Sequence, residues 1–307
     1  MITQETKKEL LSAYCEKKDV LIFAPHPDDE TLGCAGVIME AKRSGKKPGI
    51  VVCTNGDGFV TAASVFSGKE ISALSPEDFL EVARARQKDM LNAMQILGLS
   101  QNDIVFLGYP DGGLARMFST GTPYMHQFTQ KNCTYGLIMP DYHSLMFDVP
   151  APYLRSAIRE DMIELLQKTS PREIYVTHFK DGHSDHRECF YLVGEAVAKT
   201  GFKGEIFAYL IHSADGNWPL PRGANPQIPF EAQMIDGIQC PAGVSWPPDE
   251  RRPLRYDEAE AKLKAIHSYT LEMKLASCYI ESFVKNEEVF WKINDIEILQ
   301  KMRPSEM

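Results

Sequence analysis

The segment APHPDDETLGCAG, residues 24–36, places an imidazole and three carboxylates directly after a short apolar run. His26, Asp28, Asp29 and Glu30 fill positions where an α/β protein that binds a dinucleotide would carry glycines. Acidic residues at a helix N-terminus often satisfy free N–H groups and the helix dipole. Three consecutive acids exceed what capping requires, and the dipole does not account for His26. The segment therefore predicts a functional site, with helix capping as the alternative.

A second polar segment, THFKDGHSDHRECF at residues 177–190, also follows an apolar run. It holds three of the eight histidines of the chain, His178, His183 and His186, with Asp181 and Asp185 between them. The alternative interpretation is a polar surface loop with solvated histidines. Because the cluster lies at the carboxyl end of a predicted strand, metal binding is the favoured interpretation.

Apolar runs alternate with helical patterns over the first 210 residues. Strands are predicted at residues 20–24, 49–54, 104–108, 174–177 and 205–211. Helices are predicted at residues 30–44, 76–97, 152–168 and 186–200. This alternation predicts an α/β fold, a Rossmann-like doubly wound and mostly parallel sheet with strand order 3-2-1-4-5. Strands 1 and 4 are then neighbours, so both polar segments lie at the crevice where the chain direction switches.

Two imidazoles and a carboxylate at this crevice would suit a catalytic zinc ion, which takes three protein ligands and keeps an open position for water. Sites for Mg²⁺ rarely collect histidines. We therefore expect a metal site with a spare carboxylate beside it.

Two regions do not follow the alternation. Residues 112–152 form a long insert rich in Gly, Pro, Tyr, Met and His, and residues 213–307 form a Pro-rich extension with a closing helix at about 256–283. The insert leaves strand 3 at the same sheet edge as both polar segments, so part of it, with its aromatic residues, is predicted to form a wall of the crevice and to select the substrate. The alternative is that these aromatic residues only pack the insert onto the domain. We expect one domain over residues 1–307.

Composition excludes several classes of function. The 307 residues carry a net charge of −9, which argues against a nucleic-acid partner. No apolar stretch approaches the roughly 18–20 residues of a transmembrane helix, and the N-terminal residues do not resemble a signal peptide. Seven scattered cysteines indicate reduced thiols, so a cytoplasmic location is expected. The sequence leaves open whether the chain forms a homo-oligomer.

The motifs HPDDETLG and HSDH, with the intervening RARQKDMLNAMQILGL and FLGYPDG, resemble the PIG-L/LmbE superfamily of zinc-dependent N-acetylglucosaminyl deacetylases. The resemblance covers about residues 18–112 and 170–212, and EAKLKAIHSYTLEM with KNEEVFW resembles the closing helix of that family. It implies removal of acetyl groups from N-acetylglucosamine units on inositol, lipid, thiol-precursor or antibiotic carriers.

The resemblance also implies a role for individual residues. The zinc ligands that it implies are His26, Asp29 and His186, and Fe²⁺ or Co²⁺ could replace zinc. Asp28 matches the general base, and His183 matches the imidazole that stabilises the oxyanion or protonates the leaving amine. Asp185 matches the residue that orients His183.

Two residues are expected to contact the substrate at the rim of the crevice. Arg86 matches the substrate-contacting arginine of an Arg-x-x-Glu motif, which here reads RQKD and so has a shorter acid, Asp89. Asn55 lies in TNGDG, which ends strand 2 at the crevice, although such a segment is more often only a tight turn. The family carries Ser-Gln where this chain has Tyr269 and Thr270.

The leading prediction is therefore a zinc-dependent deacetylase acting on an N-acetylated amino sugar or glycoconjugate. One alternative is a zinc amidase that cleaves another amide, such as a thiol conjugate. A Mg²⁺-dependent phosphoryl-transfer domain and a sugar-binding module without catalysis are the others.

Overall fold

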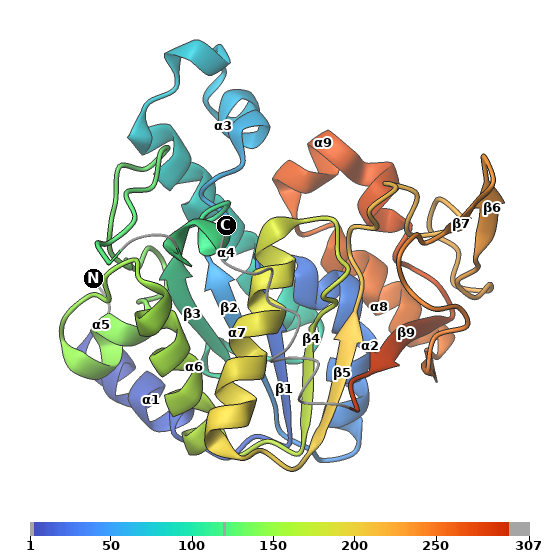
Figure 1. The fold of residues 1–307 in the computed structure, drawn as a ribbon, viewed down its shortest axis with the longest axis horizontal. Coiled ribbons are helices and arrows are strands. Elements are labelled where there is room, and N and C mark those ends of the chain that lie inside the picture. Colours follow the sequence, from blue (N-terminus) through green and yellow to red (C-terminus); the bar gives the residue numbers. More distant parts are fainter. Residues whose placement is uncertain (1–2, 119–120, 295–307) are drawn as a thin grey trace.

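A computed structural model describes residues 3–118 and 121–294 of the chain (Figure 1). Residues 119–120 of the predicted insert and residues 295–307 of the predicted C-terminal region lie outside the described residues.

A central sheet has the order β3-β2-β1-β4-β5-β9-β8. Its five parallel strands are β1 (Val20–Ala24), β2 (Pro48–Thr54), β3 (Ile104–Tyr109), β4 (Glu173–Thr177) and β5 (Glu205–Tyr209). All five residues of β1 are buried, as expected for an apolar strand that is covered on both faces. The predicted fold class and strand order are confirmed. Two antiparallel strands that were not predicted, β9 (Glu287–Lys292) and β8 (Glu250–Pro253), extend the sheet beyond β5.

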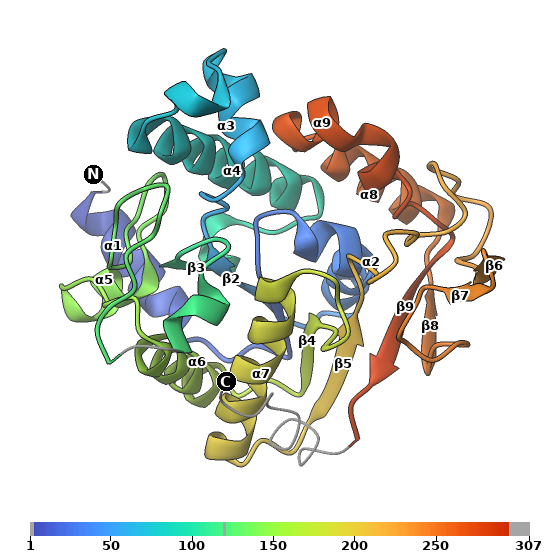
Figure 2. The same ribbon diagram turned by 45° about the horizontal axis from the view of Figure 1, so that its top comes forward.

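Helices cover both faces of this sheet (Figures 1 and 2). Those that connect the parallel strands are α2 (Asp29–Arg43), α4 (Pro76–Ile96), α6 (Arg155–Thr169) and α7 (Ser184–Thr200). Helices α6 and α7 pack on one face, and α2 and α4 lie on the other with α8 (Tyr256–Ile266). Their bounds lie within a few residues of the predicted ones. At the start of α4, Ser75 and Asp78 form a capping box, and Pro76 occupies the first helical position.

The predicted closing helix at 256–283 is instead two helices, α8 and α9 (Thr270–Glu281). Tertiary contacts explain the break between them. The Tyr269 hydroxyl donates to a carboxylate oxygen of Glu30 at 2.5 Å, and Asp89 accepts from the backbone N–H and the hydroxyl of Thr270 at 2.8 and 2.7 Å. These contacts fix the start of α9 against α2 and α4.

The described residues hold further short elements that were not predicted. They are the helices α1 (Gln4–Tyr14), α3 (Val60–Ser67) and α5 (Tyr142–Phe147) and the strand β7 (Ile238–Cys240). Strand β7 pairs with β6 (Gln233–Ile235) in a separate two-stranded sheet. No described helix is long and apolar enough to cross a membrane.

Helix α2 carries part of the first polar segment and is interrupted at Cys34, where φ and ψ leave the helical region. Beyond the break, the Glu288 carboxylate of β9 accepts from the backbone N–H groups of Gly36 and Val37 at 2.9 and 3.2 Å. Lys262 of α8 donates to the same carboxylate at 2.7 Å. Strand β9 therefore supplies a cap for the second half of α2.

Helices α3 and α9 stand above the carboxyl ends of the parallel strands (Figure 1). They share a small apolar core with α4, formed by Ala62, Ala63, Phe79, Val82 and Leu271. The ring of Phe128 from the insert stacks on Phe79, with centroids 4.8 Å apart. The insert therefore packs against the apolar core that α3 shares with α4 and α9.

Candidate active site

A cleft of about 320 Å³ opens at the carboxyl edge of the sheet. Most of its lining residues come from four places in the chain: the start of α2, residues 58–61 before and within α3, residues 211–212 after β5, and α9. None of residues 112–118 and 121–152 lines it. The prediction that the insert forms a wall of the crevice is therefore wrong for the described residues, because α3 occupies that place.

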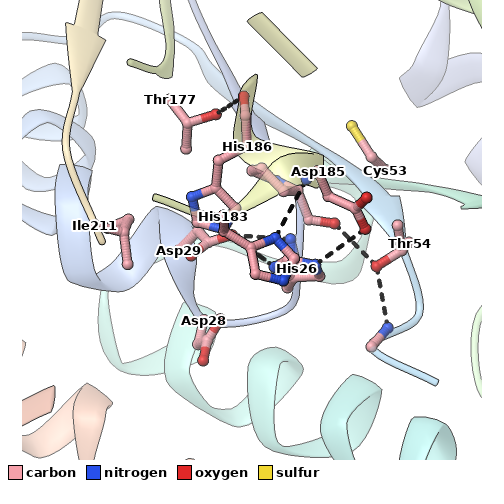
Figure 3. Close-up of polar contacts among 12 residues, drawn as sticks. His26, Asp28, Asp29, Cys53, Thr54, Thr177, His183, Asp185, His186 and Ile211 are labelled. Carbon is pink, nitrogen blue, oxygen red and sulfur yellow. Dashed lines mark hydrogen bonds and ion pairs between the residues drawn. The ribbon is translucent and has the colours of Figure 1, made fainter. Parts of the chain in front are cut away.

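Three atoms from the two polar segments converge beside this cleft (Figure 3). His26 Nδ1 lies 3.2 Å from His186 Nε2 and 3.5 Å from Asp29 Oδ2, and the last two atoms are 3.3 Å apart. His26 and Asp29 follow β1, and His186 lies in the first turn of α7 after β4. The adjacency of β1 and β4 thus brings together residues 160 positions apart in the sequence.

This spacing can be compared with that of a zinc site. Nitrogen and oxygen ligands lie about 2.0–2.2 Å from zinc, so two ligands of a tetrahedral ion are separated by roughly 3.3–3.6 Å. The three measured separations, 3.2, 3.3 and 3.5 Å, agree closely with that range. The residues present therefore fit a zinc ion.

The other nitrogen of each imidazole faces a carboxylate. His26 Nε2 lies 3.0 Å from Asp111 Oδ1, and His186 Nδ1 lies 3.2 Å from Asp181 Oδ2. Such carboxylate–histidine pairs orient metal-binding imidazoles and raise their basicity. Burial would raise the pKa of Asp29, but the imidazoles of His186 and His26 outweigh it and hold that pKa below its usual range.

Two other groups of potential ligand atoms lie within 4.8 Å of one another. One combines His26 and His186 with His183, and the other combines His26 with Asp111 and Asp185. In the second group, the His26 nitrogen involved is Nε2, which points away from Asp29 and His186. The crevice therefore holds many side chains of the types that can bind a metal ion.

Asp28 lines the cleft next to these atoms and has an unusual backbone, with φ 157° and ψ −29°. Residues with such backbone conformations concentrate at functional sites. Burial raises the pKa of Asp28 well above its ordinary value, and the Arg86 guanidinium opposes that rise. Arg86 Nη2 lies 3.3 Å from Asp28 Oδ2, and its Nε lies 2.6 Å from Glu272 Oε1 of α9.

Arg86 also lines the cleft, although it is buried and paired with both carboxylates, so its contact with substrate stays a prediction. Glu272 was not identified from the sequence. It occupies the first turn of α9, a helix whose position depends on the long-range contacts described above.

His183 lines the cleft and precedes α7 as its N-cap residue. Its Nδ1 accepts from the backbone N–H of Asp185 at 3.3 Å, so in the neutral ring the proton lies on Nε2. Burial, together with the imidazoles of His26 and His186, lowers the pKa of His183 to about 3. The ring can therefore donate a hydrogen bond through Nε2 without carrying a charge.

Asp185 contacts His183 through its main chain, and its role as the residue that orients His183 stays a prediction. Its backbone N–H makes that contact, whereas the carboxylate accepts from the backbone N–H groups of Gly112 and Leu114 at 2.6 and 3.2 Å. Asp185 Oδ2 also lies 3.5 Å from His26 Nε2. The carboxylate thus ties the start of the insert to the site.

Asn55 was predicted to contact substrate, and its position does not support that role. It is fully buried and does not line the cleft. Its carboxamide accepts from Gln87 at 2.8 Å and donates to the backbone carbonyl of Tyr135 at 3.2 Å. Asn55 therefore joins α4 to the insert beneath the cleft.

The insert also supports Asp111 through Asp57. The Tyr135 hydroxyl donates to Asp57 Oδ2 at 2.5 Å, and Asp57 Oδ1 accepts from the backbone N–H of Asp111 at 3.0 Å. Gly58 N–H then donates to Asp111 Oδ2 at 2.9 Å, which leaves Oδ1 facing His26. Instead of forming a wall, the insert positions a carboxylate of the site.

Replacement of Tyr135 by phenylalanine is expected to lower the free energy of unfolding by about 1–3 kcal/mol, because the buried Asp57 carboxylate loses a donor. Urea unfolding measures the change. Tyr124→Phe is the matched control, since Tyr124 lies in the same insert but outside this network. Equal stability of the two variants would show that the Tyr135 hydroxyl does not support Asp57.

Two further residues at the site were not identified from the sequence. Asp111 lies in the FLGYPDG motif but was assigned no role, and His212 was not considered. Both lie two or three residues after a parallel strand at the edge where the polar segments lie, Asp111 after β3 and His212 after β5. Their position shortly after a predicted strand could therefore have identified both residues as candidates for the site. Burial and the nearby His186 lower the pKa of His212 to about 4.

Solved structures share this fold over nearly their whole length. N,N'-diacetylchitobiose deacetylase from Pyrococcus horikoshii has a TM-score of 0.52 at 19% identity and covers 99% of this chain and 97% of its own. The A40926 pseudoaglycone deacetylase Dbv21 has a TM-score of 0.54 at 16% identity, covering 91% and 98%. The conserved protein TT1542 from Thermus thermophilus has a TM-score of 0.52 at 20% identity, covering 89% and 94%.

A family match covers the region that holds both polar segments. Residues 21–197, more than half of the chain, match the family described as PIG-L, GlcNAc-PI de-N-acetylase. The matched region includes His26, Asp28, Asp29, His183 and His186. With this match and the shared fold, the chain belongs to the PIG-L family.

Proposed function

We propose that the protein is a zinc-dependent hydrolase that removes the acetyl group from an N-acetylated amino sugar or glycoconjugate. The observation that carries this proposal is the mutual spacing of His26 Nδ1, Asp29 Oδ2 and His186 Nε2 beside the Asp28 carboxylate. Membership of the PIG-L family supports the same reaction, as does the deacetylase activity named for two structurally similar proteins.

His26, Asp29 and His186 hold the metal in this proposal, with Fe²⁺ or Co²⁺ as possible substitutes for zinc. Two imidazoles and one carboxylate are a ligand set of catalytic zinc sites, whereas Mg²⁺ prefers oxygen ligands. When bound, the ion supplies Lewis acidity, which lowers the pKa of water to about 7.

Asp28 is the general base. Its carboxylate accepts a proton from the water whose oxygen attacks the acetyl carbonyl carbon. Arg86, 3.3 Å away, orients that carboxylate. As the C–N bond breaks, the proton passes to the amine nitrogen, and acetate leaves with the oxygen of the water.

His183 stabilises the oxygen of the scissile carbonyl. Because Asp185 N–H occupies Nδ1, the Nε2–H group remains as a donor to the oxygen on which negative charge develops. A donor fixed before the reaction needs no reorganisation at the transition state. The neutral ring contributes a hydrogen bond to both the ground state and the transition state, and the bond strengthens as the charge grows.

Acetate release tests the proposal. The zinc-loaded protein is incubated with N-acetylglucosamine and its glycosides, with an N-acetylated thiol conjugate, and with amides of other carboxylic acids. We expect acetate and free amine in equal amounts from at least one N-acetylated sugar. Turnover of only the thiol conjugate or the other amides would indicate a different amidase. Zinc-loaded protein that releases no acid from any compound would overturn the proposal.

A further inference from the structure

His212 lies in the cleft but has no part in the reaction described above. It follows β5, and the backbone N–H groups of Ile211 and His212 both donate to Asp181 Oδ2 at 3.0 Å. The same carboxylate oxygen faces His186 Nδ1. The His212 ring centroid lies 4.9 Å from that of His186 and 5.8 Å from that of His183. The residue is therefore held rigidly next to the catalytic groups.

Tyr279 of α9 fixes the tautomer of His212. The two rings are stacked, with 7° between their planes, and the Tyr279 oxygen lies 3.0 Å from His212 Nδ1. The Tyr279 hydroxyl has one proton, and it donates that proton to the backbone carbonyl of Ile211 at 2.7 Å. Toward His212 the hydroxyl oxygen must therefore accept, so Nδ1 carries the proton and Nε2 has a lone pair.

The Nε2 atom is free to bind a ligand. Among residues 3–118 and 121–294, no protein group forms a hydrogen bond with it, and it is not one of the atoms closed off from solvent. His212 and Tyr279 both line the cleft. His212 Nε2 is therefore a fixed hydrogen-bond acceptor in the same cleft as the donor His183. Such an acceptor favours ligands that place a hydrogen-bond donor opposite it over ligands that do not.

We propose that His212 is a specificity-determining residue whose Nε2 accepts a hydrogen bond from one hydroxyl group of the sugar ring. This inference rests on the proposed function, because it assigns the substrate of the same cleft a hydroxyl near the scissile amide. An amino sugar presents several such donors around its ring, whereas an N-acetylated aliphatic amine presents none.

Deoxy sugars test this role. Acetate release is measured for a glycoside of N-acetylglucosamine and for its 3-, 4- and 6-deoxy analogues, with the wild-type protein and with His212→Phe. For the wild type, kcat/KM is expected to fall by about 10-fold or more for one of the three analogues. For His212→Phe, the parent and that analogue are expected to react within about 2-fold of each other, since the contact is already absent.

Two other variants keep the test decisive if His212→Phe folds poorly. His212→Gln retains an acceptor oxygen and is expected to keep part of the discrimination. Tyr279→Phe retains His212 but removes the group that fixes its tautomer, and it is expected to weaken discrimination against the same analogue. Zinc content and the unfolding midpoint report on the integrity of each variant.

The outcomes separate the two proposals. If His212→Phe, His212→Gln and Tyr279→Phe all keep the wild-type ratios for the three analogues, His212 does not select the substrate, and the deacetylase function stands. If kcat/KM of the His212 variants fell by the same factor for every sugar, His212 would likewise have only a structural role. If the wild type releases no acetate from any sugar, the proposed function fails, and the role of His212 fails with it.

Discussion

Replacement of Asp28 by asparagine is expected to lower kcat by about 10²-fold or more while zinc stays bound. Asparagine has nearly the shape of aspartate, but its carboxamide cannot accept a proton from water near neutral pH. Asp28 lies beside the three convergent atoms without joining them, and its nearest charged partner is Arg86. Steady-state kinetics and elemental analysis of the same preparation measure the two parts of this prediction.

Asp29→Ala provides the contrast for Asp28→Asn, because the two residues are adjacent and have different proposed roles. Asp29 Oδ2 belongs to the set of three atoms, so its loss is expected to reduce the zinc content as well as the rate. If both variants lost zinc to the same extent, the division of roles between the two aspartates would be incorrect.

Replacement of His186 by alanine is expected to remove most of the zinc and, with it, the activity. The substitution deletes one of three proposed ligands and also leaves the Asp181 carboxylate without its imidazole partner. Elemental analysis of dialysed protein gives the zinc content per chain, which we expect to be about one in the wild type.

His267→Ala is the control for His186→Ala. This histidine is nearly half exposed and pairs with Glu281 outside the cleft, so its replacement should leave the zinc content unchanged. A His186→Ala protein that folds and retains a full equivalent of zinc would mean that the ion binds elsewhere, for example at one of the other groups of ligand atoms in the crevice.

The sequence predicted the parts of the site that depend on strand order. His26 and His186 follow apolar runs that were predicted to be strands, and the doubly wound pattern makes those strands neighbours. The same reasoning could have identified His212, which directly follows the stretch predicted as strand 5. It was missed because a single histidine carries no pattern of its own.

Other parts of the site depend on tertiary contacts that have no local signal. Glu272 reaches Arg86 only because α8 and α9 separate at Tyr269, and the hydrogen bonds that separate them join residues far apart in the chain. The helical periodicity of residues 256–283 is continuous and predicts one helix. Asn55 shows the converse, because a carboxamide after a strand resembles a site residue until its partners, Gln87 and Tyr135, are known.

The cap that Glu288 provides for α2 has a consequence for the order of folding. Glu288 lies 252 residues after its partner Gly36 in the sequence, and Tyr269 lies 239 residues after its partner Glu30. Contacts over such separations form late, because closing a long loop costs entropy before any contact compensates for it. On the ribosome, the first polar segment therefore emerges long before the residues that complete its helix. We expect a nascent chain to take up zinc only after strand β9 has been released from the ribosome and has joined the sheet.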